Sequence, residues 1–202
     1  TCNNKLIGMY DMIDGTNGID TLDHGSANAA IAAGGLSLAT YEGTNVRISG
    51  IAPHAHIISY RVCDSNGCPG SAIVAAINQA VADGAHVINL SINPPSGPAR
   101  SPWVNATDLA MLDAFRAGVV VATPAGNSGS SPSTIYQLQP WALVVGNTSH
   151  GRIFGHPVTV NPGTMESVAL PASLDLAPAL TSSINGAILI KGSSVSNLDG
   201  CN

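Results

Sequence analysis

Short apolar runs alternate with segments of helical spacing along the middle of the chain. Four runs predict strands because they are continuous and rich in β-branched residues; they cover 56–62, 86–92, 119–123 and 141–146. Continuous apolar strands separated by helices are typical of a parallel sheet with helices on both faces. We therefore expect a three-layer α/β fold, mostly parallel, whose ligands bind at the carboxyl ends of the strands.

Helical spacing predicts one helix over about 71–83 and another over 105–117. In the second helix we expect three side chains to face inward: Leu109, Leu112 and Phe115. A further helix is expected after His24, where the chain through Gly35 consists almost wholly of small residues. Because these residues leave no charged face for water, this helix is predicted to be buried.

Composition excludes several kinds of partner. The chain has 202 residues, 45% of them hydrophobic, and no apolar run near the roughly 20 residues of a membrane span. Membrane insertion is therefore not expected. Only 9% of the residues are charged, the net charge is −5, and the cations are scattered singly. We expect no nucleic-acid partner, because no basic stripe is present to neutralise phosphates.

The four cysteines fall into two groups. Cys63 and Cys68 flank an Asn-Gly turn that can bring their sulfurs together, so we predict a disulfide. A zinc site is the rival interpretation, but this pair has no second pair of ligands at zinc spacing. Cys2 and Cys201 lie near the two ends, and their partners are left open.

Polar residues whose side chains can take part in catalysis lie near the ends of the predicted strands. His24 opens a helix, Ser91 lies near the end of one strand, and Asn127 follows another strand in a tight Gly-rich turn. Taken alone, His24 and Asn127 have ordinary structural interpretations: a core histidine, and a turn asparagine that bonds its own backbone. In this order on a parallel sheet, however, they form a set.

That set resembles the subtilisin-like serine proteases, in particular the large secreted type with an inserted protease-associated domain. Several motifs agree in order over roughly the first 150 residues. They are Asp23-His24-Gly25-Ser26, the segments Tyr60–Cys68 and Ile73–Ser91, the motif Ala125-Gly126-Asn127-Ser128-Gly129, and Pro140–Thr148. The resemblance implies a subtilisin-like sheet that is incomplete in this chain.

The resemblance also implies roles for individual residues. His24 would be the general base that takes the serine proton, and Asn127 would donate its side-chain amide to the oxyanion. Two backbone segments would pair with an extended peptide substrate: Ser91, Ile92 and Asn93, and Pro124, Ala125 and Gly126. The resemblance implies no cofactor and no catalytic metal, and structural calcium is left open.

This chain departs from the family pattern at three positions. Ala27 replaces a second histidine, Asn93 stands where a glycine is usual, and Pro124 stands where a small residue is usual. The first change leaves the chemistry open. The other two bear on the width of the peptide channel.

Two members of the Asp/His/Ser triad are expected outside this chain. Asp14 superficially resembles the family's aspartate, but only nine residues separate it from His24. Ser194 imitates the nucleophile, but the residues that follow it break a helix. We therefore divide the chain into a partial catalytic domain, 1–157, and a linker with the possible start of a protease-associated domain, 158–202.

Two functions from different classes remain. The first is a portion of a secreted serine endopeptidase that needs the remaining segments of its parent protease and is inactive alone. The second is a non-catalytic subtilase-like binding or structural module. In a secreted eukaryotic protein, Asn105 and Asn147 would be glycosylation acceptors, whereas Asn89 is expected to lie in a buried strand. An unrelated doubly wound α/β protein would require every motif to be a coincidence.

Overall fold

The computed structural model describes residues 2–15, 17–41, 44–93, 101–129 and 131–148, and the two short strands at 157–158 and 168–169. The chain divides into two compact units, Thr1–Asn147 and Thr148–Asn202. In the second unit, β8 (Pro157–Val158) pairs antiparallel with β9 (Val168–Ala169). All of the candidate chemistry in the described residues belongs to the first unit.

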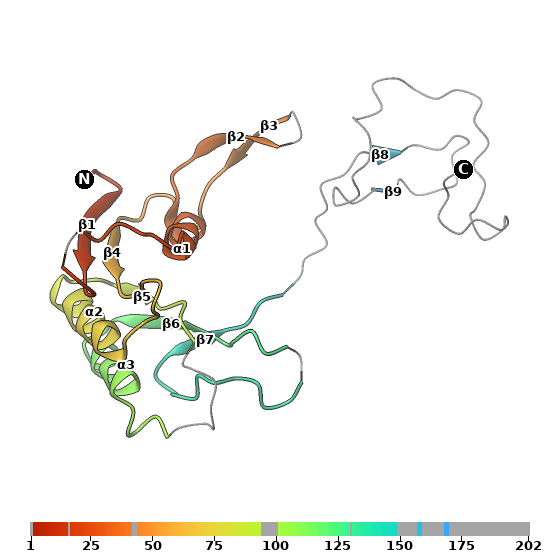
Figure 1. Cartoon of the computed structure of the whole chain (residues 1–202). Helices are drawn as coiled ribbons and strands as arrows, with labels where there is room; N and C mark the ends of the chain where they lie inside the picture. The colour runs from red at the N-terminus through yellow and green to blue at the C-terminus, as the bar shows by residue number, and fades with distance from the viewer. Residues whose placement is uncertain are drawn as a thin grey trace, which may run out of the picture. The chain divides into compact units, whose positions relative to one another are not determined.

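A three-stranded parallel sheet forms the centre of the first unit (Figure 1). Its order is β5 (Val87–Asn89), β6 (Val120–Pro124), β7 (Leu143–Val145). Two helices supply the connections, α2 (Gly70–Ala82) before β5 and α3 (Ala106–Arg116) between β5 and β6. Side-chain capping starts α3, because Asn105 Oδ1 accepts from the backbone N–H groups of Thr107 (2.9 Å) and Asp108 (3.1 Å).

The hydrophobic core lies where α2 and α3 pack against each other and α3 packs against β6. Its buried members are Ile73, Ile77, Leu90, Ala110, Met111, Ala114, Val119, Val121 and Trp141. The indole of Trp141 closes this core, donating from Nε1 to the Asp108 carbonyl at 2.8 Å. Helical spacing brings these apolar side chains onto one face of each helix, which explains why the two helices pair.

A second parallel sheet pairs β1 (Leu6–Asp11) with β4 (Ile57–Arg61). Between them in sequence lie α1 (His24–Ala33) and an antiparallel hairpin of β2 (Ser37–Tyr41) and β3 (Thr44–Ile48). The carboxyl end of α1 is covered by main chain: the N–H groups of residues 50–52 donate to the carbonyls of Gly34, Ile31 and Ala32. Gly50 permits this approach, since a Cβ there would lie 2.4 Å from Gly34 N.

The structure confirms the four predicted strands as parallel, but they belong to two separate sheets and not to one. The first belongs with β1 in a two-stranded sheet, and the other three form the separate sheet of β5, β6 and β7. Both central helices are confirmed within one or two residues of their predicted ends. The hairpin of β2 and β3 was not predicted, since no element was expected between Gly35 and residue 56.

Three expectations about burial are wrong. Among the residues of α1 only Ala33 is buried, and Ile31 is 69% exposed, so this helix lies against solvent in the described part of the chain. Phe115 is 55% exposed and Leu109 is 37% exposed, whereas Leu112 does pack against the core. The side chain of Asn89 is also exposed, because β5 is an edge strand of its sheet.

Candidate functional site

The loop before α1 places His24 through a carboxylate cap. Asp20 Oδ1 accepts from the N–H groups of Leu22 (2.9 Å) and Asp23 (3.0 Å), and its Oδ2 accepts from both Ser26 N and Ser26 Oγ at 2.8 Å. These hydrogen bonds, that from Leu22 N–H first, hold the pKa of Asp20 below its usual value. The cap satisfies N–H groups at the start of the helix, so His24 is exposed at a fixed helix end.

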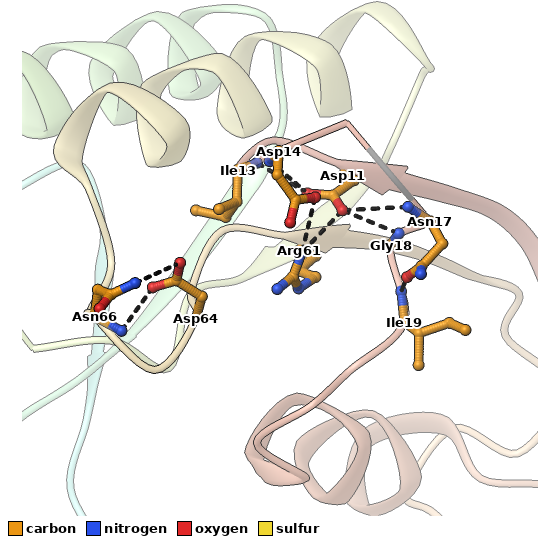
Figure 2. Close-up of polar contacts among 9 residues, drawn as sticks. All are labelled: Asp11, Ile13, Asp14, Asn17, Gly18, Ile19, Arg61, Asp64 and Asn66. Atoms are coloured by element: carbon orange, nitrogen blue, oxygen red, sulfur yellow. Dashed lines mark hydrogen bonds and ion pairs between the residues drawn. The ribbon is translucent and has the colours of Figure 1, made fainter.

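A second carboxylate organises the residues between β1 and this loop (Figure 2). Asp11, whose side chain is 4% exposed, accepts from the N–H groups of Ile13 (2.9 Å) and Gly18 (3.2 Å) and from Arg61 Nη1 (2.9 Å). The Ile13 N–H is the largest cause that holds the pKa of Asp11 far below its usual range. Asp11 thus ties the ends of β1 and β4 to the loop that leads to His24.

The same cluster contains Asp14. Its Oδ1 lies 3.3 Å from Arg61 Nη1, so one guanidinium group contacts two carboxylates. Arg61 Nε is buried and has no hydrogen-bond partner among the described residues. The hydrogen bond to Asp11 is the largest cause that raises the pKa of Arg61. In the described structure Asp14 therefore contributes to a structural ion-pair cluster.

A third carboxylate joins the β1–β4 sheet to the end of α2. Asp83 accepts from Tyr60 Oη at 2.6 Å, from Gln79 Nε2 at 2.9 Å and from Tyr10 Oη at 3.1 Å. The two tyrosine rings are stacked, with centroids 5.1 Å apart. The Tyr60 hydrogen bond is the largest cause that lowers the pKa of Asp83, while burial and then Asp83 raise the pKa of Tyr60.

Side-chain hydrogen bonds connect His24 with the end of β5. Ser91 Oγ donates to Asn28 Oδ1 at 2.9 Å, and Asn28 lies one helical turn after His24. Asn28 Nδ2 in turn donates to the His24 carbonyl at 2.8 Å and lies 3.5 Å from His24 Nε2. The predicted base and the first predicted peptide-binding segment are therefore neighbours, although 63 positions separate Asn28 from Ser91.

The two predicted peptide-binding segments also lie beside each other. A Cβ built on Gly126 would be 3.9 Å from Asn93 Oδ1, and Gly126 adopts φ +114°, a backbone conformation that favours glycine. Asn93 Oδ1 is buried and has no hydrogen-bond partner among the described residues. The Ile92 carbonyl accepts from Gln137 Nε2 at 3.3 Å, and Ala125 N–H donates to the Val145 carbonyl at 2.8 Å.

A cavity of about 350 Å³ opens beside the second of these segments. Its lining includes Ala125, Gly126, Ile135, Gly146 and Asn147. Asn127 follows Gly126 directly and is exposed, so its amide is accessible to a ligand. Pro124 ends β6, and Thr123 before it is 2% exposed.

Cys63 and Cys68 form the predicted disulfide, with their Cα atoms 4.2 Å apart. The turn between them is closed by paired backbone hydrogen bonds of Asp64 and Gly67. Cys2 is an exposed free thiol within the described residues. Ser194, Cys201 and most of the predicted segment 158–202 lie outside those residues.

Within the described ranges, no group of three or more His, Cys, Asp or Glu side chains converges as a metal site would. The helices of those ranges likewise include none long and apolar enough to cross a membrane.

Sequence reasoning missed two residues that organise this site. Asp20 was not identified, because it lies four positions before the start of α1 and not at the N-cap position, where the capping preference for Asp applies. Asn28 gave a weaker signal: it is the one polar side chain between Ala27 and Gly34, a stretch that otherwise contains only Ala and Ile. An amide at such a position calls for a hydrogen-bond partner.

The fold and these motifs define an α/β protein with a histidine-bearing helix at the carboxyl end of a parallel sheet. The chain matches the model of the subtilase family (peptidase S8) over residues 9–196, and it belongs to this family. The incomplete subtilisin-like fold expected from the sequence is thereby confirmed.

Its relatives include two subtilisin-like proteases of Arabidopsis thaliana. SBT2.1 is 34% identical over 188 residues, which are 84% of this chain and 23% of the relative. SBT1.4 is 37% identical over 172 residues, which are 76% of this chain and 22% of the relative. The chain thus spans less than a quarter of the length of these relatives.

The crystal structure of MycP1 with its N-terminal propeptide removed shares the fold. The similarity covers 73% of this chain and 55% of MycP1, with a TM-score of 0.53 and 23% sequence identity.

Proposed function

We propose that this chain is a portion of a secreted subtilisin-like serine endopeptidase. The observation that carries the proposal is the chain of side-chain contacts from His24 through Asn28 to Ser91, together with the close approach of Asn93 to Gly126. These contacts join three segments that are far apart in sequence and that each resemble a catalytic motif of the family. Membership of the family supplies the reaction, hydrolysis of peptide bonds through an Asp/His/Ser triad.

In this proposal His24 is the general base, which takes a proton from the nucleophilic serine and returns it to the leaving amine. Asn127 donates its side-chain amide to the oxyanion of the tetrahedral intermediate. In subtilisin, loss of such a donor lowers kcat by about 10²- to 10³-fold, and this known value sets the expectation for Asn127. The exposure of both side chains supports their access to substrate.

A peptide or protein substrate would lie extended between the segments 91–93 and 124–126. Main-chain groups of such segments can pair with a peptide as strands do, while a pocket accepts a side chain. The cavity of about 350 Å³ beside Gly126 is suited to that purpose. Asn93, in place of the usual glycine, would narrow the channel.

The triad aspartate and serine would come from the remaining segments of the parent protease. Exposed apolar side chains on and after α1, Ile31 at 69% and Leu36 at 62%, support the presence of a covering partner. Asp14 is an unsuitable substitute because Arg61 engages it in an ion pair. The chain alone is therefore expected to be inactive, since a base without its nucleophile has no proton to take.

This proposal requires that the protein is secreted. The disulfide of Cys63 and Cys68 supports it, because disulfides persist in oxidising compartments. Asn105 and Asn147 remain proposed glycosylation acceptors in a eukaryotic source. The structural reason against Asn89 is withdrawn, since that side chain is exposed.

The test is labelling of the full parent protein with a fluorophosphonate probe, which marks an activated serine. We expect labelling at a serine outside residues 1–202, its loss in His24→Ala, and its retention in Asn78→Ala on the exposed side of α2. An unlabelled parent would favour the alternative, a non-catalytic subtilase-like binding or structural module. Labelling of the isolated chain at Ser194 would show that the nucleophile assignment is wrong.

A further inference from the structure

Asn28 occupies the junction between the proposed base and the end of β5. Its side chain contacts His24 on one side, through the carbonyl at 2.8 Å and Nε2 at 3.5 Å, and Ser91 on the other. Ser91 Oγ also accepts from Asn89 Nδ2 at 2.9 Å. A chain of four polar side chains therefore runs from β5 to the first residue of α1.

The chemistry of these groups fixes the direction of the chain. An asparagine Nδ2 can only donate, so the hydroxyl of Ser91 accepts from Asn89 and gives its own proton to Asn28 Oδ1. Once Oδ1 of Asn28 is committed to Ser91, Nδ2 must face His24. One of its hydrogens is used by the His24 carbonyl, and Nδ2 lies 3.5 Å from the ring nitrogen Nε2, within reach of its second hydrogen.

We propose that Asn28 is a positioning residue that keeps Nε2 of His24 free of a proton until the nucleophile arrives. A donor beside Nε2 favours the neutral ring with hydrogen on Nδ1, because the hydrogen bond of one ring nitrogen sets which nitrogen is protonated. This tautomer is the one that a base needs if it is to accept a serine proton at Nε2. At 3.5 Å the contact is long, so an approaching hydroxyl can replace it.

A purely structural role explains less of what is seen. Asparagine is a poorer helix former than alanine, and α1 uses alanine at most neighbouring positions. Asn28 is also partly exposed, so no buried polar group demands it. Its contacts lead to the proposed base and to the segment proposed to hold the substrate.

The inference rests on the proposed role of His24, but its test does not require peptide hydrolysis. We would label the histidine rings of the 202-residue chain with ¹⁵N and measure each ring's tautomer by NMR at a pH where the imidazoles are neutral. His24→Gln identifies the His24 signals among the six histidines. We expect His24 to be mainly protonated at Nδ1.

The variants distinguish positioning from packing. Asn28→Ala should move His24 to the Nε2–H form that free imidazole prefers in water, and Asn28→Asp should do so more completely, because a carboxylate accepts from Nε2–H. Ser91→Ala keeps the sequence of α1 but frees the Asn28 amide to turn, so a partial shift is expected. Asn78→Ala should change nothing.

An Nε2–H ring in the unsubstituted chain, or the same tautomer in the unsubstituted chain, Asn28→Ala and Asn28→Asp, would overturn the inference. Both outcomes leave the proposed protease function intact, since that function is tested separately by fluorophosphonate labelling of the parent. Conversely, an unlabelled parent with the expected tautomer shifts would reject the protease and retain only the effect of Asn28 on the tautomer of His24.

Discussion

Two regions of the first unit are held together by different forces. The region of α2, α3 and β5–β7 contains every member of the hydrophobic core cluster, including Met111 and Val121, which are 1% exposed. The region of β1, α1 and β4 depends instead on carboxylates: Asp11, Asp20 and Asp83 each accept three or more hydrogen bonds.

This difference separates stability from site geometry. The stabilisation from burying apolar side chains is proportional to the buried area and has no preferred direction, whereas hydrogen bonds to a carboxylate fix where each partner lies. The proposed base is therefore carried by the region with directional contacts, and the proposed oxyanion donor follows a strand of the apolar core. Changes that weaken one region without the other can test this division.

The largest effect is expected from the apolar region. Met111→Ala should lower the free energy of unfolding by about 2–5 kcal/mol, because it removes a fully buried side chain and leaves a cavity. Urea denaturation would measure this change. Leu109→Ala on the same helix is the matched control, and a loss there as large as that at Met111 would contradict the assignment of the core.

The disulfide in the loop between β4 and α2 should contribute less. Replacing both Cys63 and Cys68 by serine should cost about 2 kcal/mol, the value that loop-closure entropy gives for such a short loop. The same denaturation experiment applies. Intact mass after alkylation, with and without reduction, checks the bond itself, and two thiols that alkylate without reduction would refute it.

The Asp83 cluster should show a graded and smaller effect. Tyr60→Phe removes the 2.6 Å hydrogen bond and should cost about 1 kcal/mol, since the tyrosine is only partly buried. Tyr10→Phe removes the 3.1 Å bond and should cost less. Both variants keep the stacked rings, so the difference between them reports the two hydroxyl groups. Equal losses in thermal or urea unfolding would contradict the expectation that the Tyr60 hydrogen bond contributes more than that of Tyr10.

The smallest effect expected near neutral pH is that of Asp11 on the stability of the fold, and this effect should change as the pH becomes acidic. The pKa of Asp11 is lowered on folding, so its stabilising contribution is complete above the unfolded value of about 4 and is lost as the pH falls below it. The melting temperature of Asp11→Asn should therefore fall less steeply in acid than that of the unsubstituted chain. Parallel curves would show that other carboxylates dominate.

The sequence predicted those features that depend on neighbouring residues. Continuous β-branched runs identified β4, β5, β6 and β7, helical spacing identified α2 and α3, and an Asn-Gly turn identified the disulfide. The roles of His24 and Asn127 came from motif resemblance and remain proposals. What the described structure adds is that the segment of His24 is linked to Ser91 through the side chain of Asn28.

Features that depend on distant partners could not be predicted. The contact of Asn28 with Ser91 spans 63 positions, and the local pattern of α1 does not indicate which distant residue the amide contacts. The exposure of α1 was missed for a related reason: its small residues allow close packing, but composition does not say which segment packs there. Phe115 was misplaced because its position at the edge of the helical face was read as inside.

The N–H groups of residues 50–52 form a main-chain clamp at the carboxyl end of α1. This clamp permits most side-chain substitutions within it but not the replacement of Gly50. Residues 50–52 hold the helix through N–H groups, which every residue except proline provides, so the side chains of the clamp can vary freely. Gly50 cannot, since any Cβ there collides with Gly34 N at 2.4 Å. A substitution of Gly50, in a loop 26 positions after His24, would thus displace the helix that carries His24. Its effect on function would resemble that of a substitution of His24 itself.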